Sequence, residues 1–200
     1  MGCLFFKSGY DKIPFNKIPQ DLWNIPLDNI YGGTKALGDF RKDKKAFLIV
    51  NVASCWGLTS TNYSQLVELY NKYKNEGLEI LAFPSSQFMN QEKKTNEEII
   101  DFLTENEVTF PVFTKTVVNG NETHPLYVYL KVKSSLNNGA KGLKNIPWNF
   151  GKFLMDFDGN NVQFYQPSTK PKQIENEIQK ILKHSESEEI LFKFQKINKN

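Results

Sequence analysis

Apolar residues along this chain alternate between short continuous runs and longer stretches of helical periodicity. The runs at residues 46–53 (AFLIVNVA) and 78–83 (LEILAF) are rich in β-forming residues, and each predicts a buried strand. Between them, apolar residues recur at i, i+3, i+4 and i+7 and predict a helix over residues 61–75. The first half of the chain therefore has a strand–helix–strand pattern.

The second half predicts two more helices before a closing unit. Thr95 and Glu98 have the spacing of a capping box, which predicts that a helix begins at Thr95. Another helix is expected over residues 126–133, because the preceding Pro125 is well tolerated in a first helical turn. Residues 108–113, between the two helices, are short and extended in character.

A hairpin and a helix close the predicted domain. Residues 150–157 and 162–166 flank the sequence Asp-Gly-Asn-Asn, which is a strong hairpin signal. An amphipathic pattern then predicts a final helix over residues 171–183. A strand–helix–strand half joined to a hairpin–helix half is similar to the thioredoxin-like fold, an α/β arrangement in which helices flank a central mixed β-sheet.

One domain is expected from a chain of 200 residues, 40% of them hydrophobic, because this is enough to bury a single substantial core. Prolines interrupt any pattern in residues 1–24, which are predicted to be an irregular N-terminal segment. The folded domain is expected over residues 25–183, and a charged tail is expected over residues 184–200.

Charge and cysteine content disfavour several classes of protein. The net charge is only +3 and Arg41 is the single arginine, so a nucleic-acid partner is not expected. Cys3 and Cys55 provide neither a disulfide framework nor the spacing of a zinc site, and such usage fits a reducing compartment such as the cytoplasm. No apolar run reaches the length of a membrane span.

Gly2 and Cys3 raise an alternative location, because a Gly-Cys N-terminus is used for paired myristoyl and palmitoyl anchors. Two acyl chains hold a protein on a membrane, whereas one holds it only marginally. The usual motif has Ser or Thr at the sixth position, which here is Phe6. An unmodified terminus is therefore the preferred interpretation, and a membrane tether through Gly2 and Cys3 is the alternative.

Three stretches of the sequence resemble motifs of one family. They are residues 51–59 (NVASCWGLT), 81–92 (LAFPSSQFMNQE) and 148–154 (WNFGKFL). In order and spacing they are similar to the three motifs of the glutathione peroxidases, and the resemblance extends from about residue 25 to residue 182. Three ordered motifs are far more specific than any one of them alone.

The resemblance implies thiol-dependent reduction of hydroperoxides, including hydrogen peroxide and organic or lipid hydroperoxides. It implies no bound cofactor or metal, and an external thiol reductant such as glutathione or thioredoxin. Family members surround the reacting sulfur or selenium with a glutamine, a tryptophan and an asparagine, which correspond to Gln91, Trp148 and Asn149. Amide and indole N–H groups are donors that can stabilise an anion and a peroxide oxygen.

The sequence departs from the family at the reacting atom itself. Trp56 occupies the position of the reactive cysteine or selenocysteine, and Cys55 stands one residue earlier. Neighbouring residues at a strand end point in different directions, so Cys55 is not automatically equivalent. Ser85 stands where many members have a cysteine, and residues 101–105 lack the resolving cysteine of thioredoxin-dependent members.

Several interpretations of Trp56 stay open at this point. Cys55 can be the nucleophile after a local shift of the turn, or Trp56 can be a misdecoded selenocysteine, since UGA encodes tryptophan in some genetic codes. A third interpretation is an inactive family member that acts as a structural or binding component of a larger assembly or a membrane-tethered complex. A thioredoxin-like redox module is disfavoured, because the chain has no Cys-x-x-Cys.

The connection between residues 120 and 148 is short and resembles that of the monomeric members that use lipid hydroperoxides. A monomer with an open site is therefore expected. Four lysines near this connection suit an anionic membrane surface and also suit ordinary solubility. They are Lys131, Lys133, Lys141 and Lys144. His124 precedes a predicted helix and is expected to cap it rather than to act as a base.

Overall fold

The structure of this chain is a computed structural model, in which residues 10–11, 18–137 and 143–184 are described. The predicted acylation site at residues 2–3, Lys141 and nearly all of the predicted charged tail lie outside these residues. None of the helices within the described ranges is long and apolar enough to cross a membrane.

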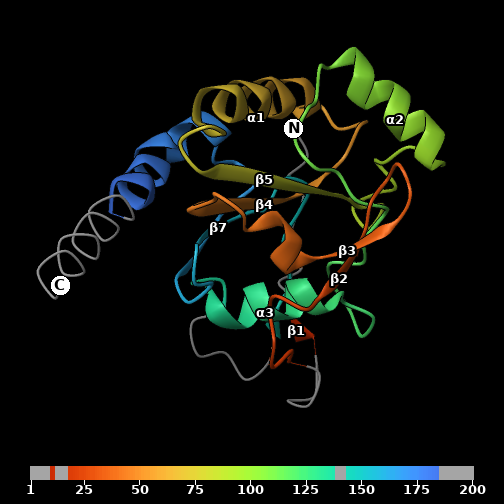
Figure 1. Cartoon of the computed structure of the whole chain (residues 1–200). Helices are drawn as coiled ribbons and strands as arrows, with labels where there is room; N and C mark the ends of the chain where they lie inside the picture. The colour runs from red at the N-terminus through yellow and green to blue at the C-terminus, as the bar shows by residue number, and fades with distance from the viewer. Residues whose placement is uncertain (1–9, 12–17, 138–142, 185–200) are drawn as a thin grey trace, which may run out of the picture.

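A four-stranded mixed sheet with the order β5-β4-β7-β8 forms the centre of the molecule (Figure 1). β4 (Ala46–Val52) runs parallel to β5 (Leu78–Pro84) and antiparallel to β7 (Lys152–Asp156). β7 continues antiparallel into β8 (Val162–Tyr165). Every residue of β4 and β5 is buried, as expected for strands covered on both faces.

Helices cover both faces of the sheet (Figure 1). Residues of α1 (Thr59–Tyr73) and α2 (Asn96–Glu105) share one hydrophobic cluster with Leu48 and Val50 of β4. The chain closes on the same cluster with the 3₁₀ turn η3 (Pro171–Ile174) and a helix over residues 175–184. α3 (Pro125–Lys133) packs on the opposite face, in a second cluster that includes the alternate β4 residues.

The thioredoxin-like fold class and its main elements were predicted correctly. The capping box at the start of α2 is confirmed, because the Glu98 N–H donates to Thr95 Oγ1 at 3.2 Å and the Thr95 N–H donates to Glu98 Oε2 at 3.1 Å. The closing hairpin is also confirmed, and His124 caps α3 by accepting the Leu126 N–H at its Nδ1. α1 begins at Thr59, two residues earlier than predicted.

The N-terminal part is more ordered than predicted. β1 (Tyr10–Asp11) pairs with β6 (Leu143–Lys144), so the segment 1–24 is not irregular throughout. β2 (Pro26–Asp28) and β3 (Thr34–Ala36) then form a hairpin, which leads into the 3₁₀ turn η2 (Leu37–Phe40). Strands of two or three residues are too short to display a periodicity, which is why the sequence pattern missed them.

Candidate active site

The turn between β4 and α1 carries two of the predicted site residues, Cys55 and Trp56. The side chain of Thr59 fixes this turn from within: its hydroxyl donates to the Ala53 carbonyl at 2.7 Å and accepts the Trp56 N–H at 3.0 Å. Thr59 is buried, and its own N–H donates to the Trp56 carbonyl at 2.9 Å. The turn is therefore held in one conformation at the carboxyl end of a central strand.

The loop after β5 lies against this turn and carries Gln91. The Cys55 N–H donates to the backbone oxygen of Gln91 at 2.9 Å. Met89 and Asn90, directly before Gln91, both have left-handed backbone conformations, with φ of 53° and 51°. These two residues turn the loop back, so that Gln91 meets the Cys55 turn.

Glu92 joins the same two segments a second time, although sequence analysis gave this residue no role. Its Oε1 accepts the Ser54 hydroxyl at 2.5 Å, the Ser54 N–H at 3.2 Å and the Lys93 N–H at 2.8 Å. The side chain is buried, and burial raises the pKa of this carboxyl group, against the opposing effect of its hydrogen bonds. Glu92, the residue after Gln91, thus holds Ser54, the residue before Cys55.

Asn149 reaches the site from the third segment, between β6 and β7. Its Nδ2 donates to the Gln91 Oε1 at 2.8 Å. The residue is fully buried, and its Oδ1 has no hydrogen-bond partner among the described residues. A buried amide oxygen without a partner retains its capacity to accept a hydrogen bond from a group that enters the site.

Trp148 precedes Asn149 and is half-buried. Its ring lies beside Phe88 of the Gln91 loop, with ring centroids 5.9 Å apart. Its backbone oxygen accepts a hydrogen bond of 3.1 Å from the side chain of Asn51 in β4. Trp148 is therefore in contact with the other two segments through its ring and through its backbone.

Trp56 and Cys55 lie differently, as the alternation of neighbouring side chains predicts. The Trp56 indole stacks on the ring of Phe150, with centroids 5.7 Å apart and planes 23° apart, while the Cys55 thiol is free and exposed. The side chain at position 56 therefore covers the residue that follows Asn149.

Seen together, the five predicted site residues come from three segments that meet at one end of the sheet. Backbone and side-chain hydrogen bonds connect Cys55, Gln91 and Asn149, and ring contacts add Trp56 and Trp148. Within the described residues, no group of three His, Cys, Asp or Glu side chains is placed to hold a metal ion.

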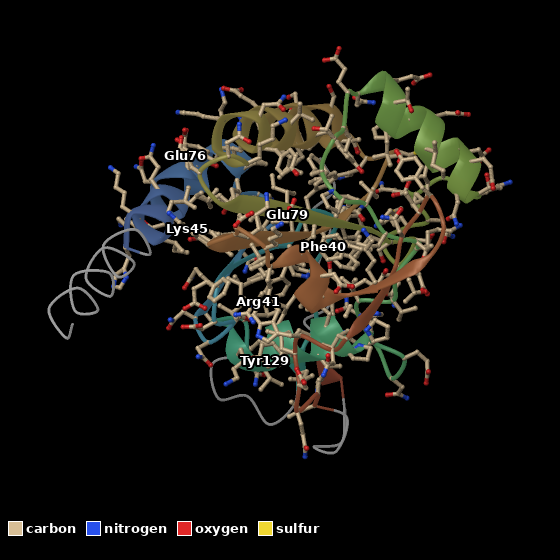
Figure 2. The ribbon with its side chains drawn as sticks, viewed as in Figure 1. Phe40, Arg41, Lys45, Glu76, Glu79 and Tyr129 are labelled. Carbon is tan, nitrogen blue, oxygen red and sulfur yellow. The ribbon has the colours of Figure 1, made fainter. Side chains whose placement is uncertain are left out.

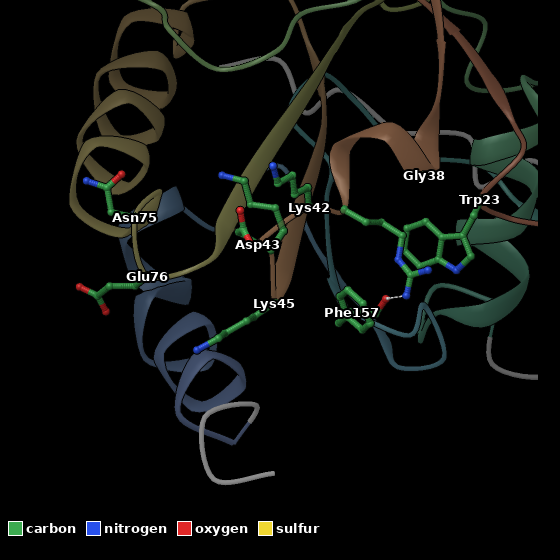
Figure 3. A pocket seen from close by; sticks show the side chains of 10 residues that line it. Trp23, Gly38, Lys42, Asp43, Lys45, Asn75, Glu76 and Phe157 are labelled. Atoms are coloured by element: carbon green, nitrogen blue, oxygen red, sulfur yellow. Dashed lines mark hydrogen bonds between the residues drawn. The ribbon is translucent and has the colours of Figure 1, made fainter. Parts of the chain in front are cut away.

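A hollow of about 820 Å³ lies at the opposite end of the sheet. Figure 3 shows Trp23 and Phe157 on one side of it and Lys45 and Glu76 on the other. Lys45, Glu76 and Arg41 are also labelled in Figure 2, away from α2. The Arg41 guanidinium lies 4.0 Å from the centroids of the Trp23 and Phe157 rings and donates to the Phe157 carbonyl, so its contacts are internal.

Comparison with known proteins finds similarity to one family. Residues 26–131 match the family model described as glutathione peroxidase. The chain is 43% identical over 169 residues to "Probable glutathione peroxidase 8" of Arabidopsis thaliana, covering 83% of this chain and 96% of the relative. It is 52% identical over 139 residues to "Probable phospholipid hydroperoxide glutathione peroxidase" of Citrus sinensis, covering 69% of this chain and 81% of the relative.

Solved structures show the same relationship. The crystal structure of T. cruzi GPX1 superposes with a TM-score of 0.64 at 30% identity, covering 82% of this chain and 97% of that one. A thioredoxin family thiol:disulfide interchange protein from Chlorobium tepidum TLS superposes with a TM-score of 0.54 at 11% identity, covering 82% and 99% of the two chains. At that identity the likeness shows the fold alone.

Proposed function

This chain belongs to the glutathione peroxidase family, and on that premise we propose that it reduces hydroperoxides with electrons from an external thiol such as glutathione or thioredoxin. Cys55 is the proposed nucleophile, and Gln91, Trp148 and Asn149 are the proposed donors around it. Nothing in the comparisons supports the alternative of an inactive structural component.

One observation carries the proposal. The Cys55 N–H donates a hydrogen bond to the backbone oxygen of Gln91, while the side chain of Gln91 accepts one from the side chain of Asn149. The residue that bears the free thiol is therefore part of the same hydrogen-bonded unit as the two amide side chains. A nucleophile and the donors that stabilise developing charge need this proximity.

The proposed reaction has two stages. In the first, the Cys55 thiolate attacks the terminal oxygen of the hydroperoxide, an S–O bond forms, the O–O bond breaks, and the released alkoxide takes up a proton to become an alcohol. The cysteine is oxidised to a sulfenic acid. N–H groups of Gln91 and Trp148 are suited to stabilise the charge that develops on the departing oxygen.

In the second stage the thiol reductant restores the cysteine. One thiol attacks the sulfenic sulfur and forms a mixed disulfide with loss of water, and a second thiol then releases Cys55 as a thiol, together with a disulfide. The chain has two cysteines, and Cys55 is the one within the described residues, so two external thiol molecules supply both electrons in this scheme.

Selenocysteine at position 56 remains a second candidate, which a specific contact favours. The Trp56 side chain, and not that of Cys55, lies over Phe150 beside Asn149. A selenocysteine at this position would place its selenium on the side of the turn that faces the segment carrying Asn149. The codon and the intact mass of the protein from its native source decide between the two, because UGG, or the mass of a tryptophan-containing chain, rules out selenocysteine.

A peroxidase assay on the intact chain tests the main proposal. Wild-type protein is expected to consume hydrogen peroxide and a lipid hydroperoxide in the presence of glutathione or thioredoxin, and Cys55→Ser is expected to lose this activity. Cys3→Ser is the matched control, because it removes the other thiol. Unaltered turnover in Cys55→Ser would contradict the role of Cys55.

Lipid hydroperoxides are a proposed substrate class, since Leu58 and Met89 expose 46% and 68% of their surface on the two segments that carry Cys55 and Gln91. A monomer, a cytoplasmic location and the alternative tether through residues 2–3 also remain proposals. Names of two relatives state mitochondrial and chloroplastic locations. Lys131 does not contribute to a membrane-facing surface, because it is fully buried.

A further inference from the structure

We propose that Lys152 is a positioning residue of the site, which holds the backbone of Phe150 and thereby directs Asn149 toward Gln91. This inference deepens the proposed function and rests on it for the catalytic consequence. The effect of Lys152 on the position of Asn149 does not depend on whether the protein is active. Neither the sequence motifs nor the predicted site residues assigned Lys152 a role.

Burial of the Lys152 ammonium group needs an explanation. Lys152 is the first residue of β7, between Val50 of β4 and Tyr165 of β8, and its side chain is fully buried. Burial lowers the pKa of Lys152 to about 7. An apolar side chain of similar length would fill the same space without desolvating an amine, so packing alone does not account for a lysine here.

The hydrogen bond of this amine identifies what it does. Lys152 Nζ donates to the backbone oxygen of Phe150 at 2.6 Å. Phe150 has a φ of 61°, in the left-handed region that non-glycine residues rarely adopt. Its N–H donates to the Asn51 carbonyl at 2.6 Å. The strained residue is thus fixed on both sides, by β4 at its N–H and by Lys152 at its carbonyl.

The backbone on either side of Phe150 is held in place, so a change in the conformation of Phe150 would be passed on to Asn149. A Cβ atom at Gly151 would approach Ile146 Cγ2 to 2.7 Å and Asn51 Oδ1 to 3.0 Å, so the backbone is packed closely there. On the other side, the Asn51 amide holds the Trp148 carbonyl. Asn149 lies between these fixed points, and its direction follows from the backbone conformation of its neighbours.

Removal of the amine therefore has a specific consequence. The Phe150 carbonyl would lose its hydrogen bond, and the left-handed conformation would lose one of its two restraints. Relaxation of Phe150 would then turn Asn149 away from Gln91. Lys152 acts through the backbone and is itself buried, so it is a positioning residue rather than a group that contacts peroxide.

Lys152→Met in the full chain tests this inference, with Lys44→Met as the matched control. Lys44 is also largely buried, but it bonds the Leu78 carbonyl and Glu79 near the opposite end of the sheet. The first measurement is the NMR spectrum of the side-chain amides. In Lys152→Met, the Asn149 amide protons are expected to exchange with solvent at least tenfold faster than in wild type, and in Lys44→Met at the wild-type rate.

The second measurement is peroxidase kinetics. Lys152→Met is expected to lower kcat at least tenfold with little change in KM. In an Asn149→Ala background the same substitution is expected to change kcat by less than twofold, because the residue through which it acts is absent. A purely structural role for Lys152 would instead lower kcat equally in both backgrounds.

The outcomes of these experiments distinguish the positioning role of Lys152 from the proposed peroxidase function. Faster Asn149 exchange in Lys152→Met, combined with no turnover by the wild-type chain, would reject the peroxidase function and retain the positioning role. Unchanged exchange with an unchanged kcat would overturn the positioning role and leave the peroxidase function standing. If Lys152→Met does not fold, Lys152→Leu, which also lacks a donor for the Phe150 carbonyl, is measured in the same way, and the same two outcomes decide.

Discussion

The side chains of Asn149 and Gln91 are joined by a hydrogen bond of 2.8 Å, although 58 residues separate them in the chain. This bond places the segment before β7 against the loop after β5. The same loop also holds the backbone of Cys55. The Asn149–Gln91 pair is therefore the link through which the C-terminal half of the chain reaches the turn that bears the thiol.

Gln91→Ala is expected to destabilise the protein and to lower peroxidase activity. The substitution leaves the Asn149 amide buried without its acceptor, which costs about 1–3 kcal/mol. Chemical unfolding and steady-state kinetics measure the two effects. Gln87→Ala is the control, because Gln87 lies in the same loop but bonds the backbone of Val118 and Asn119. Equal kcat in both variants would contradict a role for Gln91.

Glu92→Gln is expected to change the pH dependence of stability. Burial raises the folded-state pKa of Glu92, so its contribution to stability is fully present below the unfolded pKa of about 4.5 and is lost as pH rises through the higher folded value. The wild-type chain should lose free energy of unfolding relative to Glu92→Gln as pH increases through this window. Urea titrations at several pH values measure the difference.

Exposed Glu122→Gln provides the control for that series. It is expected to follow the wild-type curve at all pH values. A wild-type curve parallel to that of Glu92→Gln would show that the carboxyl group at position 92 titrates alike in the folded and unfolded chains.

For Lys152 the expected change of stability with pH has the opposite sign, and it occurs at higher pH. Its folded pKa of about 7 lies below the unfolded value of 10.5, so the unfolded chain binds more protons between these values. Stability of the wild type relative to Lys152→Met should therefore rise with pH across this interval, by at most roughly 1.4 kcal/mol per pH unit. The free energy of unfolding, measured at intervals of about one pH unit between roughly pH 6 and pH 10, checks this slope.

Trp56→Cys is expected to increase peroxidase activity while reducing stability. The substitution removes the stack on Phe150, which costs about 1–3 kcal/mol, and directs a thiol onto the segment that carries Asn149. Trp56→Ala should show the same loss of stability without the gain. If Trp56→Cys is no more active than Trp56→Ala, then position 56 is not directed at the reactive centre.

Sequence patterns predicted the larger elements because their physical causes are local. Thr95 and Glu98 cap α2 through contacts three residues apart, and the turn before β8 is encoded by consecutive residues. The resemblance of three motifs identified the candidate site residues, but no local pattern places Gln91 beside Asn149. That contact depends on how the strands assemble.

The burial of Lys152 and of Glu92 also escaped the sequence analysis. Lys152 begins a strand next to Gly151, where a lysine suggests an exposed position, and Glu92 follows Gln91 in a polar loop. Their burial depends on Asn51, Phe150 and Ser54, which approach only in the folded chain. Pattern analysis detects apolar faces, whereas a buried charge is recognised only from its partners.

The hydrogen bond between Asn51 and Trp148 spans 97 residues of the chain. During synthesis from the N-terminus, Cys55 and Gln91 leave the ribosome well before Trp148 and Asn149 exist. A nascent or truncated chain that ends before residue 148 consequently has Cys55 and Gln91 without Trp148 and Asn149, two of the three proposed donors. The proposed site is therefore complete only when the segment before the last hairpin has joined the sheet.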